Sequence, residues 1–427
     1  MDIASLRGTY DIFPPQSRIW ESVELEARRI FNVYGCSEIR TPIIEDTRLF
    51  TRSIGEGTDI VNKEMYTFPD RKGRSITLRP EGTASVVRAY LQHSLYKDQG
   101  LCRFFYIGPM FRYERPQAGR NRQFYQLGTE FLGSTHPYYD AESIALLTTF
   151  FKTVGITDAV VKLNSVGSRS SKENYSLSLK DYFAPFIKSM CEDCITRFEK
   201  NTLRILDCKN PACRETIKGA PSTEHALNQE DAEHFHSVKE YLCAMNVRFE
   251  IEPRLVRGLD YYTNTIFEVV HTRLGSQDAL GGGGRYNNLV EEMGGPSTGA
   301  VGFAVGIDRL VMVLEKILSS QETALSDSLD VYILNPNDSL SADHIVMLHA
   351  LRSCFVKADM CTEQKSFKAQ MRTANKLNAR FVLIHGEDEI RQSIIKLKNM
   401  TQKTEEIIPY TTFYTAVEKV IERIGKK

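Results

Sequence analysis

Apolar and polar positions alternate in two aromatic-rich runs that together span residues 104–131. A polar loop at 115–121, which contains a proline and a glycine, separates the two runs. Alternating runs on either side of such a loop are typical of an antiparallel hairpin. The sequence therefore predicts two paired strands joined by a long tip.

The parity of positions in this hairpin predicts a ligand-binding face. Because successive strand side chains point to opposite faces, one face carries Arg112, Glu114, Phe124, Gln126, Gly128 and Glu130. Symmetrical pairing about the tip would place Arg112 opposite Phe124 and Gly108 opposite Gly128. Charged, aromatic and amide groups then surround a floor without side chains, where a ligand can approach the backbone. The alternative is the wet side of a half-buried sheet, on which charged residues also alternate.

Helical spacing of apolar residues predicts a helix over 17–34, with Ser17 as its N-cap, and another over 138–155. The strand at 37–44, after the first helix, contains Pro42. Proline lacks the backbone donor that a ladder needs, so this strand should end there or lie at a sheet edge. An edge strand beside a long amphipathic helix is a candidate dimer surface, and packing within one chain is the alternative.

Changes in composition divide the chain into a core, an insertion and a C-terminal domain. A polar, helical stretch interrupts the core, and beyond a polar linker strands alternate with helices as in a small α/β domain. The predicted boundaries are 1–164 and 251–318 for the core, 165–250 for the insertion, 319–329 for the linker and 330–427 for the C-terminal domain.

Charge is balanced over the 427 residues, with a formal net charge of zero, so no global field attracts nucleic acid. Basic residues nevertheless recur at intervals of three and four near a helix expected at 366–379. They are Lys365, Lys368, Arg372, Lys376 and Arg380, and the spacing aligns them on one helical face. Nucleic-acid contact and a solvated lysine face are both open explanations.

The nine cysteines indicate reduced thiols in a cytoplasm. The first residues do not resemble a secretory signal, and no apolar run approaches the roughly 20 residues that a membrane span needs. Four cysteines follow the order Cys-x2-Cys, thirteen residues, then Cys-x4-Cys: Cys191, Cys194, Cys208 and Cys213. This spacing is within the range of a structural zinc site, with free cysteines as the alternative.

Three charged residues stand where an ion can bind. Glu81 lies at a turn that opens a helix, where its carboxylate can accept a cationic group or cap the helix. Arg257 precedes a glycine, so its planar fork can lie against a phosphate. Arg309 falls in the first turn of a helix expected within 300–315. A helix dipole disfavours a cation there, and we expect a bound anion in front of it.

Several separated segments resemble one family. Pro42 after a helix and strand, FRYE…RQF in the hairpin and GFAVGIDRL before a helix are similar to the three signature motifs of class II aminoacyl-tRNA synthetases. LVRGLDYY, GGGGRYNNLV and RPEGT narrow the resemblance to the histidyl-tRNA synthetases. The resemblance covers nearly the whole chain. It implies an α+β catalytic domain built on an antiparallel sheet with a helical insertion, plus a C-terminal α/β anticodon-binding domain.

The resemblance also implies substrates and partners. Histidine and ATP would form histidyl-adenylate and pyrophosphate, with Mg²⁺ accompanying the ATP, and the histidyl group would pass to tRNA(His). The family works as a homodimer in the cytoplasm. Arg112 and Arg257 would act on the α-phosphate and Arg309 on the γ-phosphate, while Phe124 would stack on adenine.

The remaining site residues follow from the same resemblance. Glu114 and Arg120 would complete the ATP site. The histidine pocket would consist of Glu81, Gly82, Thr83, Gln126, Glu130, Tyr261 and Tyr262. Arg115 and Gln117 would face the tRNA acceptor end. Lys368, Arg372, Lys376 and Arg380 would lie in the domain that faces the anticodon.

Three positions depart from the family pattern: Asn287 and Asp308 replace an expected aspartate and glutamate, and Thr202 replaces a proline. Two other classes of protein share the fold. One is a non-catalytic paralogue such as the regulatory subunit of ATP phosphoribosyltransferase, and the other is a tRNA-binding protein with a vestigial site. Histidine-dependent ATP–pyrophosphate exchange separates both from an active enzyme.

Overall fold

The computed structural model describes residues 3–55, 58, 60–98, 100–117, 119–271, 279–320, 328–335, 342–363 and 365–424. The chain divides into two compact units, Met1–Thr323 and Ala324–Lys427. Each unit has its own hydrophobic core. Among the described residues, no helix combines the length and the apolar character needed to cross a membrane.

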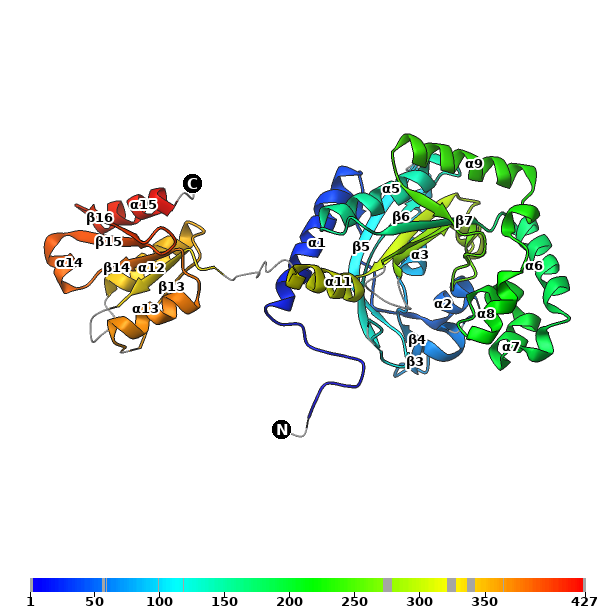
Figure 1. Ribbon diagram of the computed structural model, residues 1–427, viewed down its shortest axis with the longest axis horizontal. Coiled ribbons are helices and arrows are strands. Elements are labelled where there is room, and N and C mark those ends of the chain that lie inside the picture. Colours follow the sequence, from blue (N-terminus) through cyan, green and yellow to red (C-terminus); the bar gives the residue numbers. More distant parts are fainter. Residues whose placement is uncertain are drawn as a thin grey trace. The chain divides into compact units, whose positions relative to one another are not determined.

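The larger unit is built on an eight-stranded sheet in the order β1-β5-β6-β11-β10-β9-β7-β8 (Figure 1). Only the β1–β5 and β7–β8 pairs are parallel, so the predicted antiparallel core is confirmed. The strands are β1 (Ser37–Glu38), β5 (Cys102–Phe111), β6 (Gln123–Leu132), β7 (Val160–Ser165), β8 (Phe249–Ile251), β9 (Thr263–Val270), β10 (Ala279–Arg285) and β11 (Ala300–Gly306). The strand predicted before Pro42 is the short edge strand β1.

The hairpin of β5 and β6 has the predicted face but not the predicted register. Met110 pairs with Phe124, and Gly108 pairs with Gln126. The backbone N–H of Arg112 donates to the carbonyl of Arg122. The expected pairing was therefore wrong by two residues. A shift of two leaves every side chain on its predicted face because strand side chains alternate with a period of two.

Four helices cover one face of this sheet: α1 (Gln16–Val33), α5 (Tyr138–Thr153), α9 (Gln229–Ala244) and α11 (Ile307–Ser320) (Figure 1). The helix α1 buries Ile19, Val23, Ala27 and Ile30 at the spacing of one helical face. Its N-cap is Pro15, not Ser17 as predicted. The helix α11 continues to Ser320 and so extends into the predicted linker.

The opposite face carries the smaller elements that enclose the site. The helix α3 (Thr83–Gln92) packs there against Tyr106 and Met110 of β5. Around it lie a three-stranded sheet and several short helices. They are β2 (Ile44–Asp46), β3 (Tyr66–Pro69), β4 (Ser75–Leu78), α2 (Thr47–Ile54), the π-helix η1 (Ile60–Glu64), α4 (Leu95–Asp98) and α10 (Leu289–Glu292).

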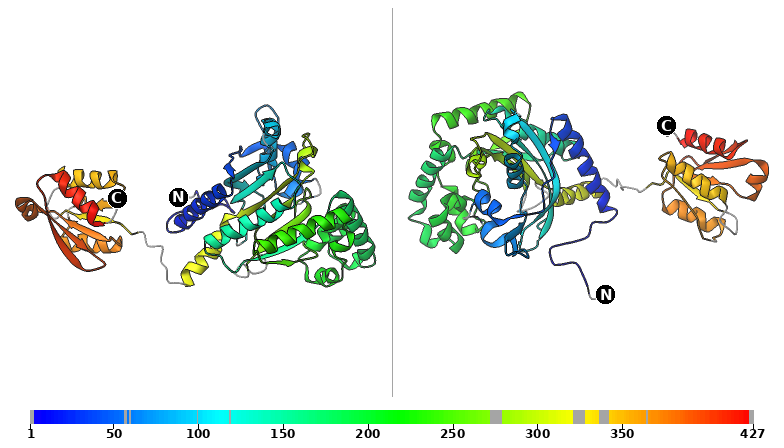
Figure 2. Two further views of the ribbon diagram at one scale, coloured as in Figure 1. Left: turned by 90° about the horizontal axis from the view of Figure 1, so that it is seen from above. Right: turned by 180° about the vertical axis from the view of Figure 1, so that it is seen from behind.

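The insertion forms a separate group of helices, drawn in green in Figure 2. Its elements are α6 (Arg169–Phe183), η2 (Ile187–Ser189), α7 (Glu192–Lys200), the 3-10 helix η3 (Thr202–Asp207), α8 (Pro211–Lys218) and η4 (Thr223–Ala226). These elements share a small core of their own. The helix α9, which also falls within 165–250, instead packs Phe235, Val238 and Leu242 into the main core.

The smaller unit has a five-stranded sheet in the order β13-β12-β14-β15-β16. Its elements are β12 (Val331–Leu334), α12 (Ala342–Ser353), β13 (Ala358–Met360), α13 (Phe367–Lys376), β14 (Phe381–Ile384), α14 (Glu387–Gln392), β15 (Ile394–Asn399), β16 (Thr404–Pro409) and α15 (Phe413–Ile424). The alternation of strand and helix was predicted, but the antiparallel hairpin of β15 and β16 was not.

The basic helix of this unit is shorter than expected. Because α13 ends at Lys376, Lys368, Arg372 and Lys376 share the helix, whereas Lys365 and Arg380 lie outside it. Arg380 instead forms an ion pair with Asp330 at 3.3 Å. The prediction of five basic residues on one helical face was therefore wrong for the first and the last.

Candidate active site

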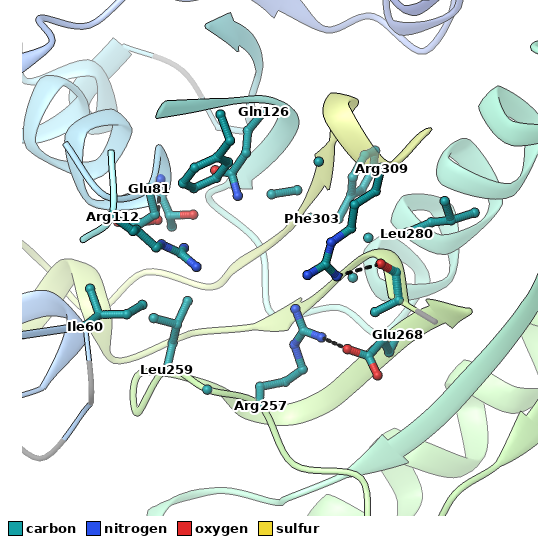
Figure 3. A pocket seen from close by; sticks show the side chains of 18 of the residues that line it. Ile60, Glu81, Arg112, Gln126, Arg257, Leu259, Glu268, Leu280, Phe303 and Arg309 are labelled. Atoms are coloured by element: carbon teal, nitrogen blue, oxygen red, sulfur yellow. Dashed lines mark hydrogen bonds and ion pairs between the residues drawn. The ribbon is translucent and has the colours of Figure 1, made fainter. Parts of the chain in front are cut away.

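A cavity of about 310 Å³ opens on the face of the large sheet that carries α3. It is lined by twelve of the residues expected to hold histidine or ATP: Glu81, Thr83, Arg112, Glu114, Arg120, Phe124, Gln126, Glu130, Arg257, Tyr261, Tyr262 and Arg309. Figure 3 shows the guanidinium groups of Arg112, Arg257 and Arg309 directed into this cavity. Of the residues expected to bind histidine, Gly82 does not line it.

Glu130 lies at the buried end of the cavity. It projects from β6, and the hydroxyl of Thr83 donates to its Oε1 at 2.6 Å. The hydroxyl of Tyr286 donates to its Oε2. Burial raises the pKa of Glu130 to about 8, and these two hydrogen bonds oppose that rise only in part. The result is a polar slot with a carboxyl group that is mostly protonated at neutral pH.

Glu81 caps the helix α3. Its two oxygens accept the backbone N–H groups of Thr83 at 2.7 Å and Ala84 at 2.8 Å. These are donors that a helix start leaves without an intrahelical partner. Burial raises the pKa of the Glu81 carboxyl despite these bonds. The structure confirms that Glu81 caps the helix. Because the side chain also lines the cavity, its binding of a cationic group stays a prediction.

Arg112 lies over an aromatic ring. Its guanidinium carbon is 5.2 Å from the ring centroid of Phe124, and its Nε donates to the carbonyl of Pro80 at 2.9 Å. Glu114 forms an ion pair with Arg120 at 3.1 Å and lies 4.0 Å from Arg112. The hairpin thus presents a fixed cation beside an aromatic face.

Arg309 stands in the first turn of α11, as predicted. Its Nε donates to the carbonyl of Gly119 at 3.0 Å, and its Nη1 donates to the carbonyl of Ala279 at 2.9 Å. Asp308, the neighbouring residue in α11, connects this helix to the hairpin by hydrogen bonds. Its carboxylate accepts the side-chain amide of Asn121 at 3.0 Å and the backbone N–H of Tyr125 at 2.8 Å.

Arg257 comes from the loop that precedes β9. Its Nη1 lies 2.7 Å from Oε1 of Glu268, which also lines the cavity (Figure 3). The next residue in this loop, Gly258, accepts a hydrogen bond from Arg204 of the insertion at 2.7 Å. The insertion therefore helps to hold the backbone that carries Arg257.

The chain matches known proteins over nearly its whole length. The histidyl-tRNA synthetase family model matches residues 8–170 and 198–310, and the model of an anticodon binding domain matches residues 330–420. The chain belongs to the histidyl-tRNA synthetase family. The histidine–tRNA ligase of Natranaerobius thermophilus is 46% identical, covering 97% of this chain and 98% of the relative. That of Halothermothrix orenii is 48% identical, covering 94% and 95%.

A solved structure of the family has the same architecture. The crystal structure of apo S. aureus histidyl-tRNA synthetase superposes with a TM-score of 0.80 at 35% identity, covering all of both chains. The predicted family and fold class are confirmed.

One departure from the histidyl-tRNA synthetase pattern has a structural explanation. The side-chain oxygen of Asn287 accepts Nη1 of Arg285 at 3.0 Å and the backbone N–H of Ala300 at 3.1 Å. An aspartate would offer the same acceptor, so Asn287 keeps both bonds without the charge. The buried Arg285 also pairs with Asp140, which supplies the compensating charge.

The floor expected to be free of side chains is filled by the protein itself. A Cβ on Gly108 would meet Nη2 of Arg79 at 2.5 Å, and one on Gly128 would meet the hydroxyl of Tyr106 at 2.5 Å. A Cβ on Gly82 would also meet the Tyr106 ring, at 2.3 Å. The glycines are required by close packing of these two side chains, so the prediction that they admit a ligand was wrong.

Sequence reasoning missed Glu268 and Tyr286, which directly contact Arg257 and Glu130. The available signal for Glu268 was that it is the one charged residue of its strand, β9. Arg115 and Gln117, expected at the tRNA acceptor end, lie exposed in the hairpin tip outside the cavity.

Proposed function

We propose that the cavity joins L-histidine to ATP and that the enzyme then transfers histidine to the 3′ end of tRNA(His). The observation that carries this proposal is the convergence of three arginines from distant segments beside a buried carboxyl slot. The triphosphate of ATP carries about four negative charges, which such cations can neutralise. The slot suits a small polar ring such as imidazole. The function is that of a histidine–tRNA ligase, as for the curated relatives that span nearly the whole chain.

Histidine occupies the slot in this mechanism. Glu130 pairs with one imidazole nitrogen, either as donor when protonated or as acceptor when ionised, and Tyr262 pairs with the other. Glu81, Thr83 and Gln126 hold the α-ammonium group. A site that hydrogen-bonds both ring nitrogens should reject amino acids that lack them by about 10⁴-fold, since its buried polar groups would remain unpaired.

ATP lies along the row of arginines. Phe124 stacks on adenine, Arg309 binds the γ-phosphate, and Arg112 and Arg257 bind the α-phosphate. A carboxylate oxygen of histidine attacks the α-phosphorus, the bond to the bridging oxygen of the β-phosphate breaks, and pyrophosphate leaves. Arg112 and Arg257 stabilise the negative charge that builds on the α-phosphate oxygens in the transition state.

Magnesium accompanies ATP in this reaction. Mg²⁺ prefers oxygen ligands and commonly uses one or two carboxylates together with phosphate oxygens and water. Glu114 lines the cavity and offers such an oxygen, so one protein carboxylate together with phosphate oxygens and water fits the ion. When bound, Mg²⁺ neutralises charge on the leaving pyrophosphate.

The second step brings in tRNA. A ribose hydroxyl at the tRNA 3′ end attacks the histidyl carbonyl carbon, and AMP leaves. The exposed hairpin-tip residues Arg115 and Gln117 contact the acceptor end. The smaller unit binds the anticodon through Lys368, Arg372, Lys376 and Arg380. The first three are supported by their shared position on α13, and Arg380 by its half-exposed side chain.

Two copies of the chain form the working enzyme. The edge strand β1 leaves one side of the large sheet unpaired, and exposed apolar side chains lie near it on α1 and in the following segment: Leu25, Val33, Ile43 and Ile44. Sedimentation equilibrium should give the mass of a dimer, and a monomer at micromolar concentration would contradict this assignment. The nine free cysteines suit a reducing cytoplasm.

Histidine-dependent ATP–pyrophosphate exchange by the purified chain tests the proposed function. We expect exchange with histidine and none with other amino acids. Histidine binding without exchange would refute the proposal and would favour a regulatory paralogue.

A further inference from the structure

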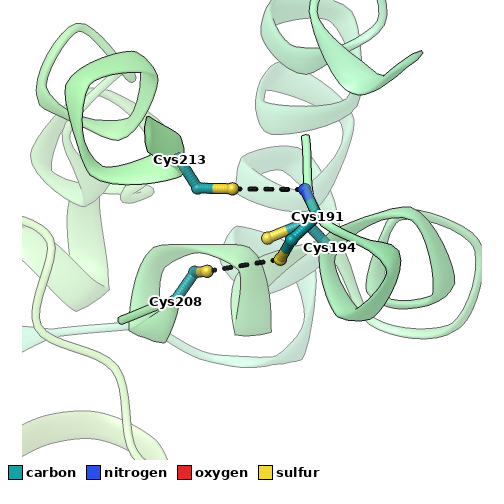
Figure 4. Close-up of side chains that lie close together, drawn as sticks. All are labelled: Cys191, Cys194, Cys208 and Cys213. Carbon is teal, nitrogen blue, oxygen red and sulfur yellow. Dashed lines mark hydrogen bonds between the residues drawn. The ribbon is translucent and has the colours of Figure 1, made fainter. Parts of the chain in front are cut away.

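Four cysteines of the insertion converge on one point (Figure 4). Cys191 caps α7 and Cys194 lies in its first turn, Cys208 follows η3, and Cys213 lies in α8. Their sulfur atoms all lie within 4.8 Å of one another. Three separate helical elements thus direct thiols at a common centre, although up to 22 residues separate two of them.

The sulfur spacing fits a tetrahedral metal site. The Sγ atoms of Cys191 and Cys208 are 3.7 Å apart. A zinc ion with Zn–S bonds of about 2.3 Å requires tetrahedral ligands about 3.8 Å apart. A disulfide would instead bring two sulfurs to about 2.05 Å. The separation therefore matches shared coordination of one ion.

The surroundings of the sulfurs suit a structural site. Cys194, Cys208 and Cys213 are 0%, 7% and 2% exposed, so none of them leaves an open coordination position toward bulk water. The backbone N–H of Cys191 donates to Sγ of Cys213 at 3.3 Å, which is the kind of outer hydrogen bond that stabilises a thiolate ligand. Closed sites with four cysteines are typical of structural zinc.

The insertion also has a physical need for such an ion. Its separate core is small, and three of its ten buried members are these cysteines. Small cores rarely supply enough hydrophobic stabilisation without a disulfide or a metal. Cysteines retained by drift, three of them buried, could contribute apolar surface, but that role would not require all four sulfurs to meet.

The element next to the cluster reaches the active site. Arg204 of η3 donates to the carbonyl of Gly258 at 2.7 Å, and Asn201, just before η3, donates to the carboxylate of Asp260 at 2.9 Å. Both contacts lie in the loop that carries Arg257, one and three residues after it. Cys208 immediately follows η3, so whatever fixes its sulfur also fixes the end of that element.

We propose that Cys191, Cys194, Cys208 and Cys213 bind one Zn²⁺ ion, and that this ion fixes η3 and through it the loop that positions Arg257. Four thiolates and the ion form the site, with no further ligand. The first half of the proposal is independent of the proposed function, and the second half rests on it.

Metal content tests the first half directly. The full chain, purified under reducing conditions without chelator, should contain about one zinc per chain by elemental analysis. Cys208→Ser should lose most of it, whereas Cys243→Ser, a change at an exposed cysteine outside the cluster, should keep it. Wild-type protein that holds no zinc and takes up none from added zinc salt would overturn the site, as would iron in its place or full zinc in Cys208→Ser.

A spectroscopic measurement covers a variant that fails to fold. Replacing zinc by Co²⁺ in the wild-type chain should produce thiolate-to-cobalt absorption in the near ultraviolet, and added zinc should abolish it. Absence of that absorption in protein that has taken up one cobalt would overturn coordination by the cysteines.

Exchange kinetics test the second half. Zinc removal by a zinc-selective chelator in excess Mg²⁺ should slow ATP–pyrophosphate exchange about tenfold, the scale of one lost hydrogen bond from a charged donor, and added zinc should restore it. Histidine binding measured by calorimetry should change little. Arg204→Ala should reproduce the loss while retaining zinc. Unchanged exchange in metal-free protein, or equal loss of histidine binding, would overturn the link to Arg257.

Discussion

Replacing Arg257 by alanine should slow adenylate formation far more than it weakens histidine binding. Arg257 lines the cavity together with Arg112 and Arg309, and its Nη1 lies 2.7 Å from Oε1 of Glu268. In the proposed mechanism, the substitution removes one cation that stabilises charge on the α-phosphate. It also leaves the Glu268 carboxylate without its ion-pair partner beside the triphosphate.

The two effects have different magnitudes. Loss of one positioned transition-state donor typically costs about 10²–10³-fold in rate. Repulsion between Glu268 and the phosphates adds about tenfold, because like charges a few ångströms apart repel by a few kcal/mol at an effective dielectric near 20 and the 27% exposed Glu268 side chain is partly screened. The double variant Arg257→Ala with Glu268→Gln should therefore recover about tenfold relative to Arg257→Ala alone.

Histidine-dependent ATP–pyrophosphate exchange measures the loss, and calorimetry measures histidine binding in the same preparations. Arg248→Ala, at an exposed arginine before β8, serves as the control and should behave as wild type. Arg257→Ala within threefold of the wild-type rate would refute the assigned role. No recovery in the double variant would refute the charge argument for Glu268.

Three further changes test other parts of the structure. Burial raises the pKa of Glu130 from 4.5 to about 8, so the ligand-free folded protein holds a proton that the unfolded chain has released. This group therefore lowers the free energy of unfolding as the pH rises from 4.5 to 8. In urea unfolding, Glu130→Gln should be more stable than the wild type at pH 8 by up to a few kcal/mol, and by less at pH 5. Gly302→Ala places a Cβ 2.0 Å from the Glu130 carboxylate, so it should lower the unfolding temperature and weaken histidine binding at least tenfold. The control Gly306→Ala, on the same strand, adds a Cβ that meets nothing within 4 Å, and it should unfold at the wild-type temperature. Arg372→Ala with Lys376→Ala should weaken tRNA charging, and charging by this variant should fall less steeply with added salt than charging by the wild type. An equal loss of adenylate formation would contradict a separate tRNA role.

Side-chain alternation allowed the cavity face of the hairpin to be predicted without the register. Phe124, Gln126 and Glu130 share that face under either pairing, because the error was a whole period of two. The register itself depends on the tip, where Gln117 bridges Arg120 out of step with the strands. No count along the sequence reveals such an irregularity.

Contacts between segments that lie far apart in the sequence are the second reason why part of the site could not be predicted. The family motifs contained the arginines proposed to bind phosphate, but Glu268 and Tyr286 act through partners 11 and 156 residues away. The end of α13 before Arg380 depends on where the chain turns to join β14, and basic spacing alone did not indicate it.

Tyr106 occupies the volume that two other positions leave vacant. Its ring and hydroxyl fill the space where Gly82 and Gly128 would each carry a methyl group. Gly82, Tyr106 and Gly128, from three different segments, thus fill one common volume beside the cavity. A side chain at position 82 therefore requires a smaller residue at position 106. Position 128 must stay glycine in either case, because a Cβ there would also lie 2.6 Å from the backbone carbonyl oxygen of Phe303.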